Sequence, residues 1–306
     1  MITRFAPSPT GPLHLGHAYS AIVAHDMAVA QGGTFLLRIE DIDRTRCRPE
    51  WEAQIYDDLR WLGLIWAEPV MRQSERMTAY RQALDVLWRM GLLYPCTCTR
   101  RDIEGALAAP QEGAERPLGP DGLIYPGTCR NRMMHERNFS DFHPLPQNCA
   151  IRLEMEWAVV SSRAFRSRIE KPDGGGNSYA GYEETGQVAG RRTGWVEFSA
   201  NDLTKGVGDV VLARRDIGTS YHLSVVLDDA AQGITHVTRG EDLSEATKIH
   251  VLLQSLLDLP TPIYHHHKLI RDDHGKRLAK RDDARAISLY RQEGATPDDI
   301  RRMVGL

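Results

Sequence analysis

The chain has 306 residues, of which 42% are hydrophobic and 26% charged, and its formal net charge is −3 at pH 7. This composition is ordinary for a globular protein, and the length allows one large domain with insertions or two domains. No apolar run approaches the roughly 20 residues of a membrane helix, and the start lacks a signal-peptide pattern, so we expect a cytoplasmic protein without membrane contacts. The charge excludes a strongly basic nucleic-acid coat protein, but local basic patches still allow a nucleic-acid partner.

A loop rich in proline and glycine follows the first apolar residues and leads into a helical run. Residues 1–5 predict a short strand, and residues 17–30 predict an apolar helix that ends at a glycine turn. The first amides of such a helix lack internal partners and favour an anion. We expect His14 and His17, three residues apart, to face one pocket and donate to phosphate oxygens. Gly16 would let a flat ring lie on the backbone.

Residues 34–39 form a short apolar run typical of a buried parallel strand, and Glu40 follows it directly. A strand, a helix and a second strand with short links make a βαβ unit. The sequence therefore predicts an α/β fold with a parallel sheet of Rossmann type. Ligands bind at the carboxyl ends of such strands, and both the loop over 4–17 and Glu40 are expected at that edge.

The rest of the chain is organised around this unit. In chain order we predict helices at 49–64 and 73–92, an irregular inserted module at 95–150, strands at 150–160, 208–215 and within 234–242, helices at 220–229 and 243–258, a strand end at 265–267, and a basic loop leading into a short helical C-terminal region. Residues 161–205 show no clear pattern. We therefore expect the first half of the Rossmann domain at 1–94 and the inserted module at 95–150. The remainder of the insertion and the second half of the Rossmann domain follow at 151–260, and the basic loop and helical tail at 261–306.

The basic loop contains Arg277-Leu278-Ala279-Lys280-Arg281 after a glycine at position 275. The glycine favours mobility, and Lys280 can reach phosphate oxygens as a compact point charge. Cations of this kind suit an attack on an α-phosphate that releases pyrophosphate, a reaction in which the protein acts mainly by positioning and charge.

Two of these segments together resemble one family. The block RFAPSPTGPLHLGH over 4–17 resembles the HIGH signature of class I aminoacyl-tRNA synthetases, in particular the glutamyl-tRNA synthetases, and the basic loop resembles their KMSKS loop. The resemblance implies that His14, His17 and Lys280 are catalytic. It also implies that ATP binds, with Mg²⁺, to His14, Gly16, His17, Arg277, Leu278, Ala279, Lys280 and Arg281. Ala279 stands where the family usually has serine, so one hydroxyl contact is expected to be missing.

The same resemblance implies a glutamate pocket. A buried pocket for an acidic side chain needs fixed cations, ideally arginine. By resemblance to glutamyl-tRNA synthetases, Glu40 takes the α-ammonium group and the whole set of glutamate-binding residues is Arg4, Ala6, Ser8, Glu40, Tyr221 and Arg239. Val225 stands where full-length relatives typically have asparagine, which predicts a less polar pocket and a lower affinity for glutamate.

Three of the five cysteines form a pattern with one tyrosine. Cys96-x-Cys98 is followed by Tyr125-Pro-Gly-Thr-Cys129, which resembles the zinc module of the glutamyl-Q-tRNA(Asp) synthetase group. Structural zinc takes four ligands, and three cysteines fall one short. The resemblance implies one structural Zn²⁺ held by Cys96, Cys98, Tyr125 and Cys129. Free buried thiols are the alternative.

Only residues 282–306 follow the basic loop, so we expect no helical anticodon-binding domain in this chain. The whole pattern is similar to the glutamyl-Q-tRNA(Asp) synthetases, truncated paralogues of glutamyl-tRNA synthetases. This implies a monomeric enzyme that activates L-glutamate with ATP, without tRNA, and transfers the glutamyl group to queuosine at the wobble position of tRNA(Asp). Alternatives are a catalytic fragment of a glutamyl-tRNA synthetase that charges tRNA(Glu), a glutamate ligase with another acceptor, and an RNA-binding module with a decayed site. No motif in the chain explains how queuosine is read.

Overall fold

Parallel strands form the centre of the computed structural model, which describes residues 1–107, 117–130, 144–165, 179–186, 193–271 and 285–306. Strands β1 (Ile2–Phe5), β2 (Thr34–Ile39) and β3 (Ala67–Arg72) pair in the order β1-β2-β3 and are all parallel. Strands β11 (His236–Gly240), β12 (Ile263–His267), β8 (Tyr179–Glu184) and β9 (Gly194–Ser199) follow the order β11-β12-β8-β9. Their pairs are parallel except for β8 with β9.

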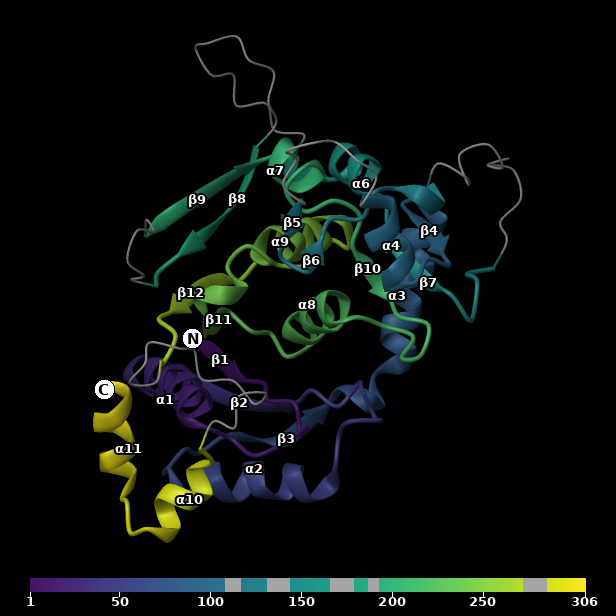
Figure 1. Ribbon diagram of the computed structural model, residues 1–306. Helices are drawn as coiled ribbons and strands as arrows, with labels where there is room; N and C mark the ends of the chain where they lie inside the picture. Colours follow the sequence, from purple (N-terminus) through teal and green to yellow (C-terminus); the bar gives the residue numbers. More distant parts are fainter. Residues whose placement is uncertain (108–116, 131–143, 166–178, 187–192, 272–284) are drawn as a thin grey trace.

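The two sets of strands meet at β1 and β11, which lie side by side in Figure 1. The backbone N–H of Thr235, just before β11, donates to the carbonyl of Ile2 at 3.0 Å. The amide of Ile2 in turn donates to the Thr235 hydroxyl at 2.8 Å. The predicted Rossmann-like parallel sheet is therefore confirmed, and strands 230 residues apart in sequence bring their carboxyl ends to one edge.

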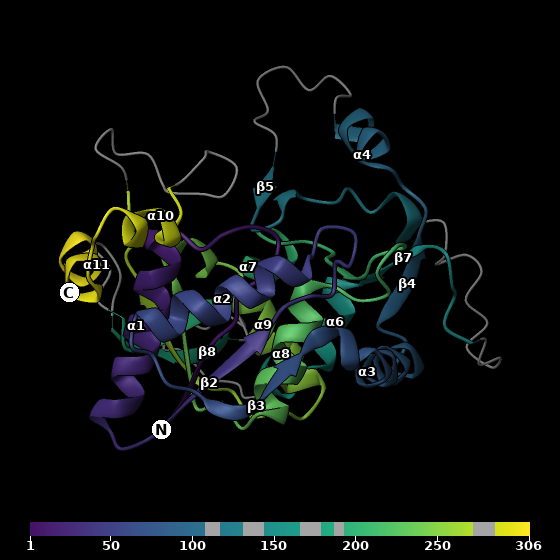
Figure 2. The ribbon, with the colours of Figure 1, turned by 90° about the horizontal axis from the view of Figure 1, so that it is seen from below.

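Helices cover both faces of this sheet (Figures 1 and 2). On one face, α1 (Leu15–Ala30) and α2 (Pro49–Trp61) share an apolar cluster with β2, which includes Ile22, Ile55 and Leu59. On the other face, α8 (Tyr221–Ala231), α9 (Thr247–Leu256) and α3 (Met77–Arg89) contribute to a second cluster. A strand buried on both faces must be apolar at successive positions, which explains the continuous run in β2.

Alternation along the strands decides which side chains face which layer. The Thr3 hydroxyl donates to the carbonyl of Ala24 in α1 at 2.7 Å, so Thr3 faces that helix. Arg4, the next residue, therefore faces α8. In β2, Phe35, Leu37 and Ile39 join the cluster of α1 and α2, which leaves Arg38 on the α8 side. Two arginines thus reach the same layer from neighbouring strands.

A second, antiparallel sheet lies at the end of the molecule away from the C-terminal helices (Figure 1). It consists of β10 (Val211–Ala213), β7 (Ala150–Leu153) and β4 (Leu93–Cys96), in that order. The other elements, in chain order, are the 3₁₀ turn Gln73–Glu75, α4 (Arg100–Leu107), β5 (Leu118–Gly119), β6 (Gly122–Leu123), α6 (Met155–Ser161), the 3₁₀ turn Arg163–Phe165, α7 (Ala200–Thr204), the 3₁₀ turn Glu241–Leu243, α10 (Ile287–Gln292) and α11 (Pro297–Val304).

The prediction of one strand over 150–160 is wrong. The strand ends at Leu153, and α6 begins at Met155. Met155, Ala158 and Val159 are the buried residues of this segment, a spacing that buries one face of a helix. The expected helix at 73–92 begins with a 3₁₀ turn and is α-helical only over 77–89. Strands β3 and β4, and the hairpin of β8 and β9 inside 161–205, were not predicted.

Within the described ranges, no helix combines the length and the apolar character needed to cross a membrane.

Candidate active site

A cavity of about 370 Å³ opens at the carboxyl ends of β1, β2, β11 and β12. The residues that line it come from these strand ends, from the start of α1 and from the start of α8. They are Arg4, Phe5, Ala6, His14, Gly16, His17, Ser20, Glu40, Tyr221, Thr238, Arg239, Gly240, Asp242, Leu243, His267, Lys268, Leu269 and Ile270. Four strand ends converge because the strands are parallel, which is the usual geometry of a ligand site in this class of sheet.

His14 and His17 cap the start of α1. The Gly16 amide donates to His14 Nδ1 and the His14 amide to His17 Nδ1, both at 3.1 Å. Because each Nδ1 accepts a hydrogen bond from a backbone N–H, Nε2 is the ring nitrogen that carries the proton in each neutral imidazole. A Cβ at Gly16 would lie 3.0 Å from His14 Cε1, so the ring that rests on this glycine is that of His14 itself.

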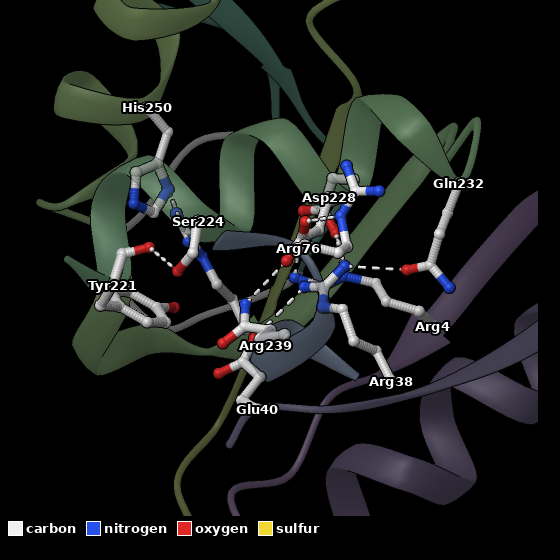
Figure 3. Close-up of polar contacts among 12 residues, drawn as sticks. Arg4, Arg38, Glu40, Arg76, Tyr221, Ser224, Asp228, Gln232, Arg239 and His250 are labelled. Atoms are coloured by element: carbon white, nitrogen blue, oxygen red, sulfur yellow. Dashed lines mark hydrogen bonds and ion pairs between the residues drawn. The ribbon is translucent and has the colours of Figure 1, made fainter. Parts of the chain in front are cut away.

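Arg4 and Arg38 lie next to each other beside α8 (Figure 3), and both contact the carboxylate of Asp229 in that helix. Arg4 Nε lies 3.0 Å from Asp229 Oδ1, and Arg38 Nη1 lies 2.6 Å from the same oxygen. Burial alone would raise the pKa of Asp229, but the two guanidinium groups outweigh it and hold that pKa below its usual value. The buried charge of Arg4 is therefore partly balanced inside the protein.

Glu40 lies beside Arg38, whose Nη2 donates to Glu40 Oε1 at 3.2 Å. Burial raises the pKa of Glu40 despite the attraction of Arg38 and Arg4. A cationic group bound in the cavity next to Glu40 would favour its ionised form, because an added positive charge stabilises a carboxylate. Glu40 is therefore suited to an ammonium ligand.

Arg239 differs from the other two arginines in its partners. Its guanidinium contacts Thr247 Oγ1 at 2.6 Å, His250 Nδ1 at 2.9 Å and His266 Nε2 at 3.2 Å. Only 6% of the residue is exposed. Within the described ranges it forms no ion pair with a carboxylate, so a buried positive charge at the cavity wall has neutral partners only. An anionic ligand group would complete it.

Several residues at the cavity were missed from the sequence, among them His267 and Ser20. His267 Nε2 lies 2.8 Å from the hydroxyl of Ser20, and His267 Nδ1 donates to the carbonyl of Lys268 at 2.9 Å. Burial lowers the pKa of His267, so the ring adds a neutral polar group to the wall. Alternation along β12 could have predicted this, since His267 must face the α1 side when His266 faces α9.

A second acidic residue of α8, Asp228, holds the base of the site. It is fully buried and accepts from Gln73 Nε2 at 2.9 Å, from the Tyr80 hydroxyl at 2.7 Å and from Arg76 Nε at 2.6 Å. These bonds fix α3 and the turn before it to α8. Two successive acids at the end of an apolar helix were the signal in the sequence.

The sequence-predicted site residues are brought together only in part. Arg4, Ala6, His14, Gly16, His17, Glu40, Tyr221 and Arg239 all line the cavity, whereas Ser8 does not. Val225 packs into the apolar cluster around α8 and α9 and does not line the cavity, so the expected loss of pocket polarity has no basis in the geometry. The basic loop residues Arg277, Leu278, Ala279, Lys280 and Arg281 lie outside the described residues.

The cysteines of the insertion converge with Tyr125. The sulfur atoms of Cys96, Cys98 and Cys129 lie within 4.8 Å of one another, and the Tyr125 hydroxyl is 3.5 Å from the first and 3.4 Å from the second. Zinc–sulfur bonds of about 2.3 Å in a tetrahedron separate sulfur atoms by about 3.8 Å, close to this spacing. The donor set therefore fits a metal ion that prefers thiolates.

The surroundings of this cluster act differently on its donors, because burial raises the pKa of Cys98 to about 11. Hydrogen bonds, including one with Tyr125, outweigh burial and lower the pKa of Cys129 to about 6. The Cys129 amide donates to the Tyr125 oxygen at 2.7 Å, and the guanidinium of Arg152 lies 3.9 Å from the centre of the Tyr125 ring. The backbone hydrogen bond from Cys129 favours a phenolate at Tyr125, but burial and the hydrogen bonds with the three thiols outweigh it and raise the pKa of Tyr125.

Comparison with known proteins places the chain in a family. The family of class I tRNA synthetases (E and Q), catalytic domain, matches residues 1–160 and 182–306. A glutamyl-Q tRNA(Asp) synthetase of Rhodobacter capsulatus is 61% identical over the full length of both chains. A glutamyl-Q tRNA(Asp) synthetase of Nocardia farcinica is 40% identical and aligns with 97% of this chain and 81% of its own.

Solved structures share the fold. A glutamate tRNA ligase from Elizabethkingia meningosepticum, crystallised with its amino acid, superposes with a TM-score of 0.69 at 25% identity. All of this chain aligns with it, but only 60% of that longer chain is covered. A glutamate-tRNA synthetase from Elizabethkingia anophelis gives a TM-score of 0.70 at 24% identity.

Proposed function

Since the chain belongs to the class I tRNA synthetases of the glutamate and glutamine group, we propose that it activates L-glutamate with ATP and transfers the glutamyl group to queuosine in the anticodon of tRNA(Asp). The names of its most similar relatives support the acceptor. The observation that carries the choice of amino acid is Arg239, a buried cation at the cavity wall whose described partners are neutral.

Each end of the amino acid has a partner in the cavity. The γ-carboxylate accepts from Arg239, the buried cation that lacks an ionic partner among the described residues. The α-ammonium group lies at Glu40, and Tyr221 at the start of α8 closes the wall. Arg4, already bonded to Asp229, shapes the floor and adds positive potential. We assign Ala6 to the backbone wall of the same pocket, and Ser8 to the loop beyond it.

The α-carboxylate of glutamate then attacks the α-phosphorus of ATP. A bond forms between a carboxylate oxygen and phosphorus, the bond to the β-phosphate oxygen breaks, and pyrophosphate leaves with the bonding electrons. His14 and His17 direct Nε2–H groups at the phosphate oxygens from the start of α1, where Gly16 leaves room for the ring of His14. Lys280, within the loop Arg277, Leu278, Ala279, Lys280 and Arg281, neutralises developing charge, and Mg²⁺ accompanies ATP.

Cys96, Cys98, Tyr125 and Cys129 hold one structural Zn²⁺ in this proposal, because three thiols and a hydroxyl converge at metal-like spacing. When bound, the ion ties β4 to the segment before Cys129 and takes no part in the chemistry. The enzyme works as a monomer in the cytoplasm, where ATP and tRNA are found.

The test is glutamate transfer in vitro. Purified enzyme should exchange pyrophosphate with ATP when glutamate is present and tRNA is absent. It should then transfer labelled glutamate to tRNA(Asp) that contains queuosine, but not to tRNA(Asp) without queuosine or to tRNA(Glu). Transfer to tRNA(Glu) would favour the alternative, a glutamyl-tRNA synthetase fragment, and strict dependence of the exchange on tRNA would contradict activation of glutamate alone.

A further inference from the structure

A continuous chain of hydrogen bonds runs from the cavity to the inserted segment. Arg239 Nη1 lies 2.9 Å from His250 Nδ1, His250 Nε2 lies 3.1 Å from His222 Nδ1, and His222 Nε2 lies 2.9 Å from a carboxylate oxygen of Asp121. Arg239 is in β11, His250 is in α9 and His222 is in α8. Asp121 lies in the turn between β5 and β6, 101 residues before His222.

The direction of every bond in this chain is determined by its two ends. Arg239 can only donate, so His250 Nδ1 must be the acceptor and His250 Nε2 carries the proton. The Nε2–H group of His250 donates to His222 Nδ1, so His222 carries its own proton on Nε2. The carboxylate of Asp121 can only accept and receives it. The arrangement requires both rings to be neutral and to have the proton on Nε2.

Losing the acceptor at Asp121 would remove the constraint that this carboxylate places on the tautomer of His222. Without the carboxylate, His222 is free to carry its proton on Nδ1, where it would face the proton on His250 Nε2. To relieve that clash, His250 would change to the tautomer with its proton on Nδ1. That proton would then face the guanidinium of Arg239, and their hydrogen bond would be lost. One exposed carboxylate therefore reinforces, from the far end, the tautomers of two buried rings and the bond that holds Arg239.

The surroundings support a neutral ring at His250. Burial, followed by the positive charges of Arg239 and Arg4, lowers the pKa of His250 well below its usual value. His266 contacts Arg239 through Nε2 and the buried carboxylate of Glu184 through Nδ1. The hydrogen bond with His222, with a smaller effect of Arg152, outweighs burial and lowers the pKa of Asp121, so its carboxylate is ionised and can accept. The ring of Tyr221 packs against both histidines.

We propose that Asp121 is a positioning residue for glutamate binding, which orients Arg239 through His222 and His250 from the turn between β5 and β6. This inference rests on the proposed function, because it assigns Arg239 to the γ-carboxylate of glutamate. It makes a turn of the inserted segment part of the specificity for the amino acid, although Asp121 does not contact the cavity. The side chain of Asp121 is 55% exposed, so its replacement leaves the core intact.

The test compares three full-length variants in glutamate-dependent pyrophosphate exchange. Asp121→Ala should raise the KM for glutamate about three- to tenfold, the effect of one net hydrogen bond, with kcat and the KM for ATP nearly unchanged. Asp121→Asn keeps an oxygen that accepts from His222 and should restore the KM to within about twofold of wild type. Glu104→Ala removes another exposed carboxylate that lines the same wide groove as Asp121 and should change nothing.

A second readout does not depend on activity. Long-range ¹H–¹⁵N spectra of the histidine rings should show the Nε2–H tautomer for His222 and His250 in the wild type and a mixture of tautomers in Asp121→Ala. An unchanged glutamate KM in Asp121→Ala, or an Nδ1–H tautomer at either ring in the wild type, would overturn the inference. If the wild-type enzyme fails to activate glutamate while the tautomers behave as expected, the proposed function fails and the hydrogen-bond chain stands.

Discussion

The side chain of Arg4 is bound to Asp229 by two bonds, from Nε at 3.0 Å and from Nη2 at 3.4 Å. Both groups are buried. The sequence predicts the same role for Arg4 and Arg239, but the structure shows that they differ. Arg4 has a carboxylate partner within the fold, whereas Arg239 has neutral partners in the described part of the chain.

Replacing these two arginines should therefore have different effects. Arg239→Ala should raise the glutamate requirement steeply and leave ATP binding nearly unchanged, since a bound carboxylate would lose a buried partner at a cost of roughly 2–5 kcal/mol. Arg4→Ala should also raise the glutamate requirement, but it should lower thermal stability as well, because Asp229 keeps only Arg38. Pyrophosphate exchange and thermal unfolding measure the two effects. Normal glutamate dependence in both variants would place the pocket elsewhere.

Lys280→Ala should lower the rate of adenylate formation by roughly two to four orders of magnitude, as expected for loss of a charge contact made in the transition state. The KM for glutamate should change little, because the loop is expected at the phosphates. Single-turnover formation of glutamyl adenylate isolates this step. A wild-type rate would contradict the assignment of the basic loop.

The purified protein should contain about one zinc ion per chain, measured by metal analysis without chelators. Tyr125→Phe should weaken zinc binding without abolishing it, because three thiolates remain. Removing the metal should impair glutamate transfer to tRNA more than adenylate formation, since the cavity lies in the parallel sheet and not in the insertion. Zinc-free wild-type protein would contradict the site, and equal loss of both steps would contradict its separation from the adenylate site.

The free energy of unfolding should decrease as the pH rises from about 4 to about 6, because of Asp58 in α2. Burial, followed by the charge of Asp57, raises the pKa of Asp58 to about 6, and neither oxygen has a hydrogen-bond partner within the described residues. The folded state then binds a proton that the unfolded state has released, so the free energy of unfolding decreases as pH rises through this range. Asp58→Asn should remove this decrease and gain about 2 kcal/mol at pH 7.

Denaturant unfolding of both proteins at several pH values from 4 to 8 would check this. Glu50→Gln serves as the control, because that carboxylate is exposed in the same helix and its charge is not among the causes that shift the pKa of Asp58. Parallel pH profiles for the wild type and Asp58→Asn would contradict the prediction.

Contiguous segments determined much of the result by themselves. The first strand, the histidine-capped helix and the strand before Glu40 are local patterns. The resemblance of the block over 4–17 to the family is visible in the sequence without knowledge of the fold. The resemblance to a zinc module implied that Cys96, Cys98, Tyr125 and Cys129 lie together, and in the structure they do. Such patterns survive in sequence because each depends on backbone conformation and neighbours a few residues away.

Only the tertiary structure decided which charges are balanced. The partner of Arg4 lies 225 residues away, and the chain from Arg239 to Asp121 crosses β11, α9, α8 and a turn of the insertion. Alternation along a strand indicates that Arg4 faces a helix, but strand order and helix packing decide whether an aspartate or a neutral histidine meets it there. Hydrogen bonds act over about 3 Å, so their partners depend on the assembled layers and cannot be predicted from local sequence.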